Sequence, residues 1–522
     1  HRITPCLAGN KDTRLSGNCC PALFIGFRSK DQEMKHCRNI LSIVVVMILL
    51  GLLARPVSAA TFHLARFSAD VTIPLGHRCM GVLPTKSKEI VDPLRVYGFV
   101  LLGAEKPIVL AAFDWCEIRN DAYDDWRDAL AAAAGTVRQR VLVSSLHQHD
   151  APVIDRGAQQ LLDKFGLQGE LYDMAFHQQA IQRVARAVTD SLEHAEPVTH
   201  IGLGRARVEQ VASNRRVELA GGQVHYGRGS SSGGSQQNRD ADDGEIDPWL
   251  RTISFWNQRR PLLALHSYAT HPMSYYGRGG VSWDFVGIAR ERRAVDDRGI
   301  MQVYLSGCSG DVTAGKYNDG SPDNRVVLAD RLYQAMTAAW QETTRVPLKH
   351  VGFRNTSFDL AFNDAEQFSR AALSATLENA DADVRERILA AMGLASLDRI
   401  AAGRQIDMPC VELGTARIVL FPGETFVGYQ LMVCLHIKIE INRTASSISG
   451  PREMWNFCGV GFSGFASPNP YKPPLFRYWI CADVSPTGNS VLMRDMDTRA
   501  VAIKYKTVVI TLDVVAPDFS CR

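Results

Sequence analysis

The sequence predicts an α/β fold, in which a layered α/β/α domain with a mixed sheet precedes an irregular β-rich or unstructured tail. Apolar runs typical of buried strands alternate with helical segments, as in layered α/β domains. Residues 171–192 carry Met174, Ile181, Val184 and Val188 at helical spacing. The 522 residues, 46% of them hydrophobic, are enough to bury a large core.

In the first half of this domain, strands are expected at residues 69–73, 94–102, 108–113 and 141–146, with a helix at 121–134. Residues 220–245 are rich in Gly, Ser and Asp without a hydrophobic period, which predicts a surface loop. The second half is expected to contain a hairpin of 250–256 and 262–268, a strand at 299–305, helices at 324–341 and 364–402, and a last strand at 411–420.

The N-terminal region has the layout of an export signal. Met34 precedes Lys35 and Arg38, an apolar run at residues 40–54 and a small-residue stretch at 56–60. We therefore expect residues 1–33 to be a non-native upstream extension and 34–59 to be a signal peptide. A retained membrane anchor through residues 40–54 is the alternative, although about 20 residues are needed to span a bilayer. The protein is accordingly expected to be exported, secreted or periplasmic.

Two further parts are expected, a main α/β domain at residues 60–431 and a tail at 432–522. The tail is rich in Pro, Ser, Cys and aromatic residues and lacks long amphipathic helices. It is either a small β domain or the product of a shifted reading frame.

Charge and cysteine spacing exclude some classes of protein. Lys and Arg number 58 against 55 Asp and Glu, a net charge of +3, and the first sixty residues contribute the whole excess. This balance gives no reason to expect a nucleic acid partner. The twelve cysteines contain no C-x-x-C pair, so a cysteine zinc knot is not expected.

Three histidines and a glutamate follow apolar runs. His147 and His149, in L-H-Q-H-D, are two residues apart, a spacing that puts both side chains on one face of a strand. They can share a metal, or one can ligate while the other transfers protons. His271, in A-T-H-P-M-S, and Glu424, in F-P-G-E-T, can complete a His₂Glu zinc set with one position open for water. A helix N-terminal acid is the alternative role for Glu424. His266 is expected to be a hydrogen-bonded core residue.

The segment G-C-S-G-D-V-T at residues 307–313 packs glycines, an acid and a hydroxyl after another strand. Its glycines let backbone approach a ligand closely. Asp311 and Thr313 are candidate catalytic residues, and a turn residue is the alternative reading of Thr313.

The ordered motifs S-S-L-H-Q-H-D-A-P, A-S-N-R-R, I-D-P-W-L-R, A-T-H-P-M-S, G-D-V-T and F-P-G-E-T resemble the catalytic domain of the neutral/alkaline ceramidases. The resemblance covers roughly residues 60–431. The neutral/alkaline ceramidases are secreted or membrane-bound zinc amidases that cleave the N-acyl bond of ceramide to give sphingosine and a fatty acid. The resemblance implies that this protein is a zinc-dependent hydrolase of a linear amide. Its expected partner is a lipid or another N-acyl amide, with association at a membrane surface.

Residue by residue, the resemblance implies that His147, His271 and Glu424 are zinc ligands. It also implies that His149 lines the site and that Arg215 holds the polar group of the substrate. Thr313 stands where the family has Ser, and the family's tyrosine ligand downstream of the Glu has no matching motif in residues 435–522.

Two other functions are compatible with these residues. One is a metal-free hydrolase with Thr313 as nucleophile and His149 as base. The other is a non-catalytic protein that binds a lipid or sugar on the same scaffold.

Overall fold

The computed structural model describes residues 62–433 apart from 81, 219–221, 232–235 and 360–364, together with four short strands between 455 and 501. The predicted extension, the signal peptide or anchor, and most of the tail lie outside the described residues. Within the described residues, no helix is both long enough and apolar enough to cross a membrane.

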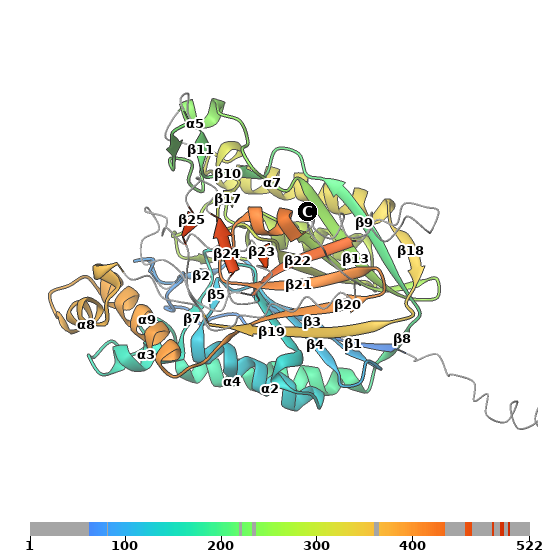
Figure 1. Cartoon of the computed structure of the whole chain (residues 1–522), viewed down its shortest axis with the longest axis horizontal. Coiled ribbons are helices and arrows are strands. Elements are labelled where there is room, and N and C mark those ends of the chain that lie inside the picture. Colours follow the sequence, from blue (N-terminus) through green and yellow to red (C-terminus); the bar gives the residue numbers. More distant parts are fainter. Residues whose placement is uncertain are drawn as a thin grey trace, which may run out of the picture. The chain divides into compact units, whose positions relative to one another are not determined.

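Two five-stranded mixed sheets form the centre of the described domain (Figure 1). The first has the order β6-β4-β3-β1-β8 and contains β1 (Phe62–Asp70), β3 (Arg95–Leu102), β4 (Ile108–Phe113), β6 (Val141–Ser145) and β8 (Glu196–Val198). The second has the order β16-β14-β13-β9-β18 and contains β9 (His200–Arg207), β13 (Trp249–Asn257), β14 (Arg260–Tyr268), β16 (Met301–Ser306) and β18 (Thr344–Pro347). Only β4 with β6 and β14 with β16 are parallel pairs in these two sheets.

The two sheets pack face to face through an apolar core. Phe99 of the first sheet meets Phe255 of the second with ring centroids 5.2 Å apart. Strands β4 and β6 are buried along their whole length, as expected for strands covered on both faces. A third sheet has the order β19-β20-β21-β22 and contains β19 (Val351–Phe358), β20 (Ile406–Leu413), β21 (Ala416–Pro422) and β22 (Trp455–Gly461). Its Val411 and Ile418 extend the same core.

Helices cover the outer faces of both sheets, so the layers run α/β/β/α. The first sheet is covered by α2 (Asn120–Ala134) and α4 (Met174–Leu192). Three further helices, α3 (Arg156–Asp163), α9 (Val384–Ala401) and α8 (Arg370–Glu378), extend the same apolar core, with α3 and α9 packed on α2 and α8 packed on α9. The second sheet is covered by α6 (Asp284–Asp296) and α7 (Pro322–Gln341). Helix α7 approaches β9 closely because Gly204 lacks a side chain, whose Cβ would lie 1.9 Å from the Ala339 carbonyl oxygen.

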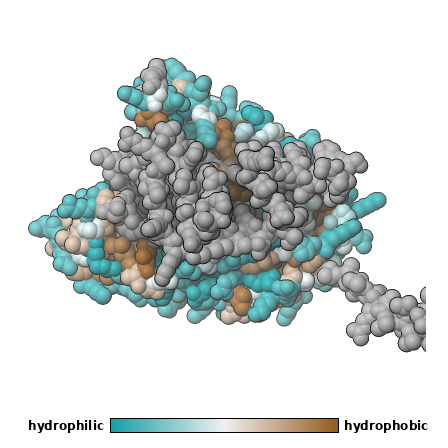
Figure 2. All heavy atoms as spheres, in the orientation of Figure 1, coloured by the Kyte–Doolittle hydropathy of each residue, from teal (hydrophilic) through white to brown (hydrophobic). Residues whose placement is uncertain are grey.

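The remaining elements are short. They are β2 (Glu89–Ile90), β5 (Glu117–Ile118), β7 (Val153–Ile154), β10 (Ser213–Asn214), β11 (Val217–Glu218), β12 (Val224–His225), α5 (Gln236–Asp240), β15 (Gly280–Val281), β17 (Val312–Thr313), β23 (Asp483–Val484), β24 (Val491–Arg494), β25 (Ala500–Val501), and the 3₁₀ turns η1 (Arg138–Arg140), η2 (Gly315–Tyr317) and η3 (Glu366–Phe368). On the face seen in Figure 2, the described surface is mostly hydrophilic with scattered apolar patches.

The predicted α/β class and the mixed pairing are confirmed, and five details differ. The strand expected at 69–73 lies earlier, in β1, which ends at Asp70. The single expected sheet is two packed sheets. The strand expected at 411–420 is a hairpin of β20 and β21, turned at Gly414, whose φ is 61°. The helix expected at 364–402 is two helices, because the chain turns between α8 and the Asp383 cap of α9. The loop expected at 220–245 contains β12, which pairs with β11 just before the loop, and α5.

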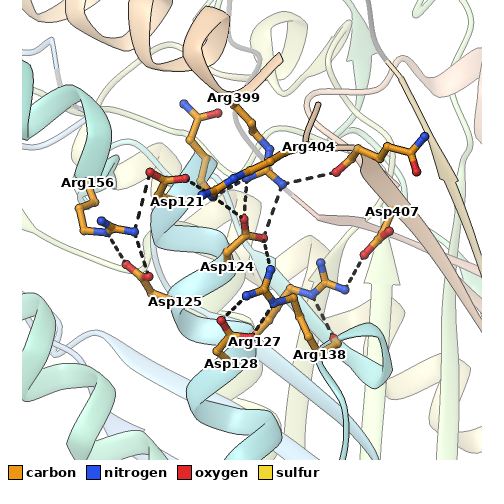
Figure 3. A network of polar contacts seen from close by, with 12 residues as sticks. Asp121, Asp124, Asp125, Arg127, Asp128, Arg138, Arg156, Arg399, Arg404 and Asp407 are labelled. Carbon is orange, nitrogen blue, oxygen red and sulfur yellow. Dashed lines mark hydrogen bonds and ion pairs between the residues drawn. The ribbon is translucent and has the colours of Figure 1, made fainter. Parts of the chain in front are cut away.

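A network of ion pairs joins α2 to the later part of the chain (Figure 3). Asp124 of α2 is bound by Arg399 of α9 at 2.7 Å and by Arg404 at 3.3 Å. Arg127 of the same helix pairs with Asp407 of β20 at 2.7 Å. These contacts fix α9 and β20 against α2.

We expect Arg399→Met to lower the free energy of unfolding by about 2–4 kcal/mol, because it removes the shortest and most buried of the arginine contacts to Asp124 and leaves only the longer ones to Arg404 and Arg138. Arg404→Met is the matched control: its side chain is 48% exposed, and its loss should cost about 0–1 kcal/mol. Urea denaturation of both variants measures the difference. Equal decreases in the free energy of unfolding in the two variants would show that the buried Arg399–Asp124 pair stabilises the fold no more than the exposed Arg404 contact does.

Candidate metal centre

The carboxyl ends of several strands meet at one end of the packed sheets. His147 follows β6 of the first sheet, His271 follows β14 of the second, and Glu424 follows β21 of the third. The Ser306 hydroxyl at the end of β16 donates to the Leu146 carbonyl at 2.7 Å, which ties the two large sheets together beside the site. Three chain segments distant in sequence therefore contribute to one place.

His147 is held in a fixed orientation by backbone. Its φ of 67° is unusual for a residue other than glycine, and its own N–H donates to the Trp115 carbonyl at 2.9 Å. Nδ1 lies 3.2 Å from the Cys116 carbonyl oxygen, so it carries the proton of the neutral ring and donates it there. Nε2 is left as an acceptor, 3.4 Å from Glu424 Oε1.

His271 is arranged in the same way from the opposite side. Its Nδ1 donates to the Ser309 carbonyl oxygen at 2.6 Å and lies 3.2 Å from that of Val312. Its Nε2 lies 3.5 Å from Glu424 Oε2. Burial lowers the pKa of His271, so the ring is neutral near pH 7 and this contact is not an ion pair.

Two imidazole acceptors therefore face the two oxygens of one carboxylate. Burial raises the pKa of Glu424, and only positive charge at its neighbours His147, His271 and Arg215 holds that pKa far below its usual range, so an ionised Glu424 needs a cation facing it. Lone pairs directed at one another in a buried site are unfavourable unless a cation lies between them. Neutral imidazole Nε2 atoms and a carboxylate are ligands that zinc takes, and Nδ1–H bonds to carbonyls are the usual support of such ligands. The residues fit a zinc ion.

His149 completes the group of histidines. Its ring centroid lies 5.3 Å from that of His147 and 6.0 Å from that of His271, and one nitrogen from each of the three rings falls within 4.8 Å of the others. Its buried Nδ1 has no hydrogen-bond partner among the described residues. Burial, followed by the two neighbouring histidines, lowers the pKa of His149 well below its usual value, so the ring is neutral near pH 7.

Arg215 supplies a positive charge to the site. Its side chain is half-buried, and its guanidinium makes no ion pair or hydrogen bond within the described part of the chain. Its charge lowers the pKa of His149, His271 and Glu424, which places it close to all three. A cation that is not neutralised beside the site is suited to bind a polar group of a ligand.

Asp311 fastens the segments that carry Arg215 and Glu424. Its carboxylate accepts the Val427 N–H at 2.9 Å and the Asn214 side-chain amide at 3.1 Å. Its carbonyl accepts the Arg215 N–H at 2.7 Å. Both carboxylate oxygens are thus used within the protein, and the structure gives Asp311 a positioning contact.

Thr313 is fully buried in β17, which pairs with β10. Its hydroxyl donates to the Gly229 carbonyl at 2.8 Å and accepts the Gly315 N–H at 2.9 Å. The proton of this hydroxyl is therefore already donated to a backbone carbonyl, so it is not available to a base or an oxyanion in this arrangement. The structure thus places Thr313 in a turn contact, the alternative given by its sequence context.

The glycines of 307–313 do allow a close approach, to protein rather than to ligand. A Cβ on Gly310 would lie 2.1 Å from the Glu424 carbonyl oxygen, and the Gly310 N–H donates to the Thr425 carbonyl at 3.1 Å. His266, predicted to be a hydrogen-bonded core residue, lies 2.8 Å from the Thr252 hydroxyl and 2.9 Å from Gln302 Oε1, and this prediction is confirmed.

Sequence reasoning missed two neighbours of the histidines. Glu117 lies 3.9 Å from His147 Nδ1, and Tyr276 packs edge-on against His149 with ring centroids 4.7 Å apart. The signal for Glu117 was its place just after β4, the parallel neighbour of β6. Tyr276 lies in a loop after the A-T-H-P-M-S motif, and no spacing rule indicates which way its ring turns.

Comparison with known structures identifies the fold. The chain is similar to a ceramidase in complex with C2, with a TM-score of 0.53, 15% identity and coverage of 78% of this chain and 68% of that one. It is also similar to the neutral ceramidase from Pseudomonas aeruginosa, with a TM-score of 0.51, 16% identity and coverage of 78% and 67%. No protein-family model and no curated protein sequence matches. The domain has a neutral-ceramidase-like fold.

We expect Thr313→Val to lower the free energy of unfolding by about 1–3 kcal/mol, because it leaves the Gly315 N–H and the Gly229 carbonyl without their partner. Thr313→Ser keeps the hydroxyl and serves as the control, with a smaller loss. Thermal and urea denaturation measure both. Wild-type stability in Thr313→Val would contradict the structural role assigned to this hydroxyl.

Proposed function

We propose that the protein is a zinc-dependent hydrolase that cleaves the amide bond of an N-acyl substrate such as an N-acylsphingosine. The observation that carries the proposal is the arrangement of His147, His271 and Glu424, in which two imidazole Nε2 atoms face the two oxygens of one carboxylate. The similarity to two ceramidase structures, one of them in complex with C2, supports the reaction class.

His147, His271 and Glu424 would hold the zinc. Bound zinc supplies Lewis acidity that polarises the amide carbonyl and makes a water molecule more acidic. His149, neutral near pH 7 and with one nitrogen unpartnered, is suited to accept a proton from water and return it to the leaving amine. Its place beside both ligand rings puts it within the reacting region.

Arg215 would orient the substrate. Its guanidinium is positive, lies close to Glu424 and has no carboxylate partner among the described residues. Donors of this kind stabilise negative charge that develops on a carbonyl oxygen. Asp311 would act on the same step indirectly, by fixing the backbone of Arg215.

The metal-free alternative is less compatible with the geometry. It needs the Thr313 hydroxyl beside His149, whereas that hydroxyl is bound to Gly229 and Gly315. A non-catalytic binding protein is distinguished from the hydrolase by assay, since both would keep the histidine cluster.

The family's tyrosine ligand would fall after Glu424, where the chain beyond residue 433 is almost entirely outside the described residues. We retain export, through residues 34–59, as a proposal that sequencing of the mature N-terminus tests.

The full-length protein should contain about one zinc per chain, and His147→Ala and His271→Ala should each lose it, since each removes a ligand. His350→Ala is the matched control, because its side chain is 68% exposed on another part of the surface. Elemental analysis of the purified variants gives the stoichiometry. Intact wild-type protein without a bound metal would refute the zinc site.

Hydrolysis of a short-chain N-acylsphingosine should stop with a chelator and return with zinc. His149→Ala should keep its zinc and lose about 10²–10⁴-fold in kcat, the usual range for a positioned acid or base. Loss of zinc in this variant would make His149 a third ligand instead. Failure of the zinc-loaded wild type on a panel of N-acyl amides and esters would favour a binding protein.

A further inference from the structure

A second buried cluster lies behind His147, on the side away from Glu424. Nδ1 of His147 lies 3.2 Å from the Cys116 carbonyl oxygen and 3.9 Å from Glu117 Oε1, with the Cys116 thiol at 3.8 Å. All three residues are buried. The imidazole therefore lies between two carboxylates, Glu424 before it and Glu117 behind it.

Glu117 is rigidly fixed in this position. Its other oxygen, Oε2, accepts from Arg119 at 2.8 Å, and the Arg119 side chain is only 2% exposed. Arg119 also donates to Asp155 at 3.4 Å. Asp155 is held in turn, because as the N-cap of α3 it accepts the Ala158 N–H of the first turn, and it also accepts the side-chain amide of Asn120. A connected row of side chains thus runs from α3 to the ring of His147.

The row carries an excess of negative charge. Glu117 and Asp155 supply two carboxylates and Arg119 one guanidinium, and Glu117 is the member next to the ring. A carboxylate near Nδ1–H stabilises the proton at that atom, which keeps Nε2 free and makes it a stronger donor to a metal.

We propose that Glu117 is a positioning residue of the metal centre. It fixes the Nδ1–H tautomer of His147 together with the Cys116 carbonyl, and its charge strengthens the bond from Nε2 to the zinc. The inference rests on the proposed zinc site and adds to it a residue that does not touch the metal.

Cys116, Glu117 and His147 could instead form a metal site of their own, since their ligand atoms lie close together. The contacts oppose this reading. The Nδ1 atom already donates to a carbonyl, and Glu117 already binds Arg119. Metal stoichiometry distinguishes the two interpretations, because a separate site at this cluster would raise the stoichiometry to two metal ions per chain.

Glu117→Gln tests the proposal in the full-length protein, because it removes the charge while keeping the size and an acceptor for Arg119. Zinc affinity, measured by competition with a chromophoric chelator, should fall about 10–100-fold, the usual effect of losing such a partner. Glu117→Asp keeps the charge and should recover most of the affinity, which a general packing defect would not allow. Glu412→Gln, a glutamate that pairs with Arg354 at 3.3 Å in the third sheet, is the control and should bind zinc as the wild type does.

The outcomes are distinct. A wild type that holds zinc, with equal affinity in Glu117→Gln, overturns the role of Glu117 and leaves the zinc site standing. A wild type without zinc overturns the zinc site and this inference with it. Two zinc ions per chain, reduced to one by Glu117→Gln, would assign the cluster to a second metal. Should Glu117→Gln fail to fold, Glu117→Gln with Arg119→Gln removes both charges of the pair, and wild-type affinity in it would equally overturn the proposal.

Discussion

The candidate metal centre depends on the hydrogen bonds that hold two imidazole rings through Nδ1. Backbone carbonyls of Cys116 and Ser309 take those protons, so both Nε2 atoms must turn to Glu424. A carbonyl oxygen can only accept a hydrogen bond, so in a neutral ring Nδ1 must carry the proton and Nε2 must be the acceptor. The fit to a cation follows from that one constraint, and burial, which lowers the pKa of His271, keeps that ring neutral.

The packing of the sheets makes this arrangement possible. Parallel pairing of β4 with β6 and of β14 with β16 sends four strand ends to one place, and the Ser306–Leu146 hydrogen bond joins the two sheets there. Glu424 arrives from the third sheet, and the close approach at Gly310 and the Asp311–Val427 bond lock its segment in position. The apolar layers thus build the scaffold, and a few polar contacts at its end set the chemistry.

Residue patterns predicted the fold class and the residues at the strand ends, but not the turns within apolar stretches or the side-chain partners. Buried strands read as apolar runs, so the α/β class was predictable, and residues after such runs, including His147 and His271, could be expected to gather. A turn inside an apolar stretch is harder to predict from sequence than the stretch itself, and for this reason the hairpin turned at Gly414 was predicted as one strand. Side-chain partners are set by tertiary contacts: Thr313 looked available until Gly229 was seen to bind it, and Glu117 gave no motif. The roles of Arg215 and His149 remain predictions.

A crystal of the protein soaked with zinc, measured at the zinc absorption edge, tests the central claim most directly. We predict one anomalous peak at about 2.1 Å from the Nε2 atoms of both His147 and His271, with a Glu424 oxygen at a similar distance. The Nδ1 atoms should still face the Cys116 and Ser309 carbonyls. A peak at the Cys116 thiol, or none near Glu424, would contradict the account.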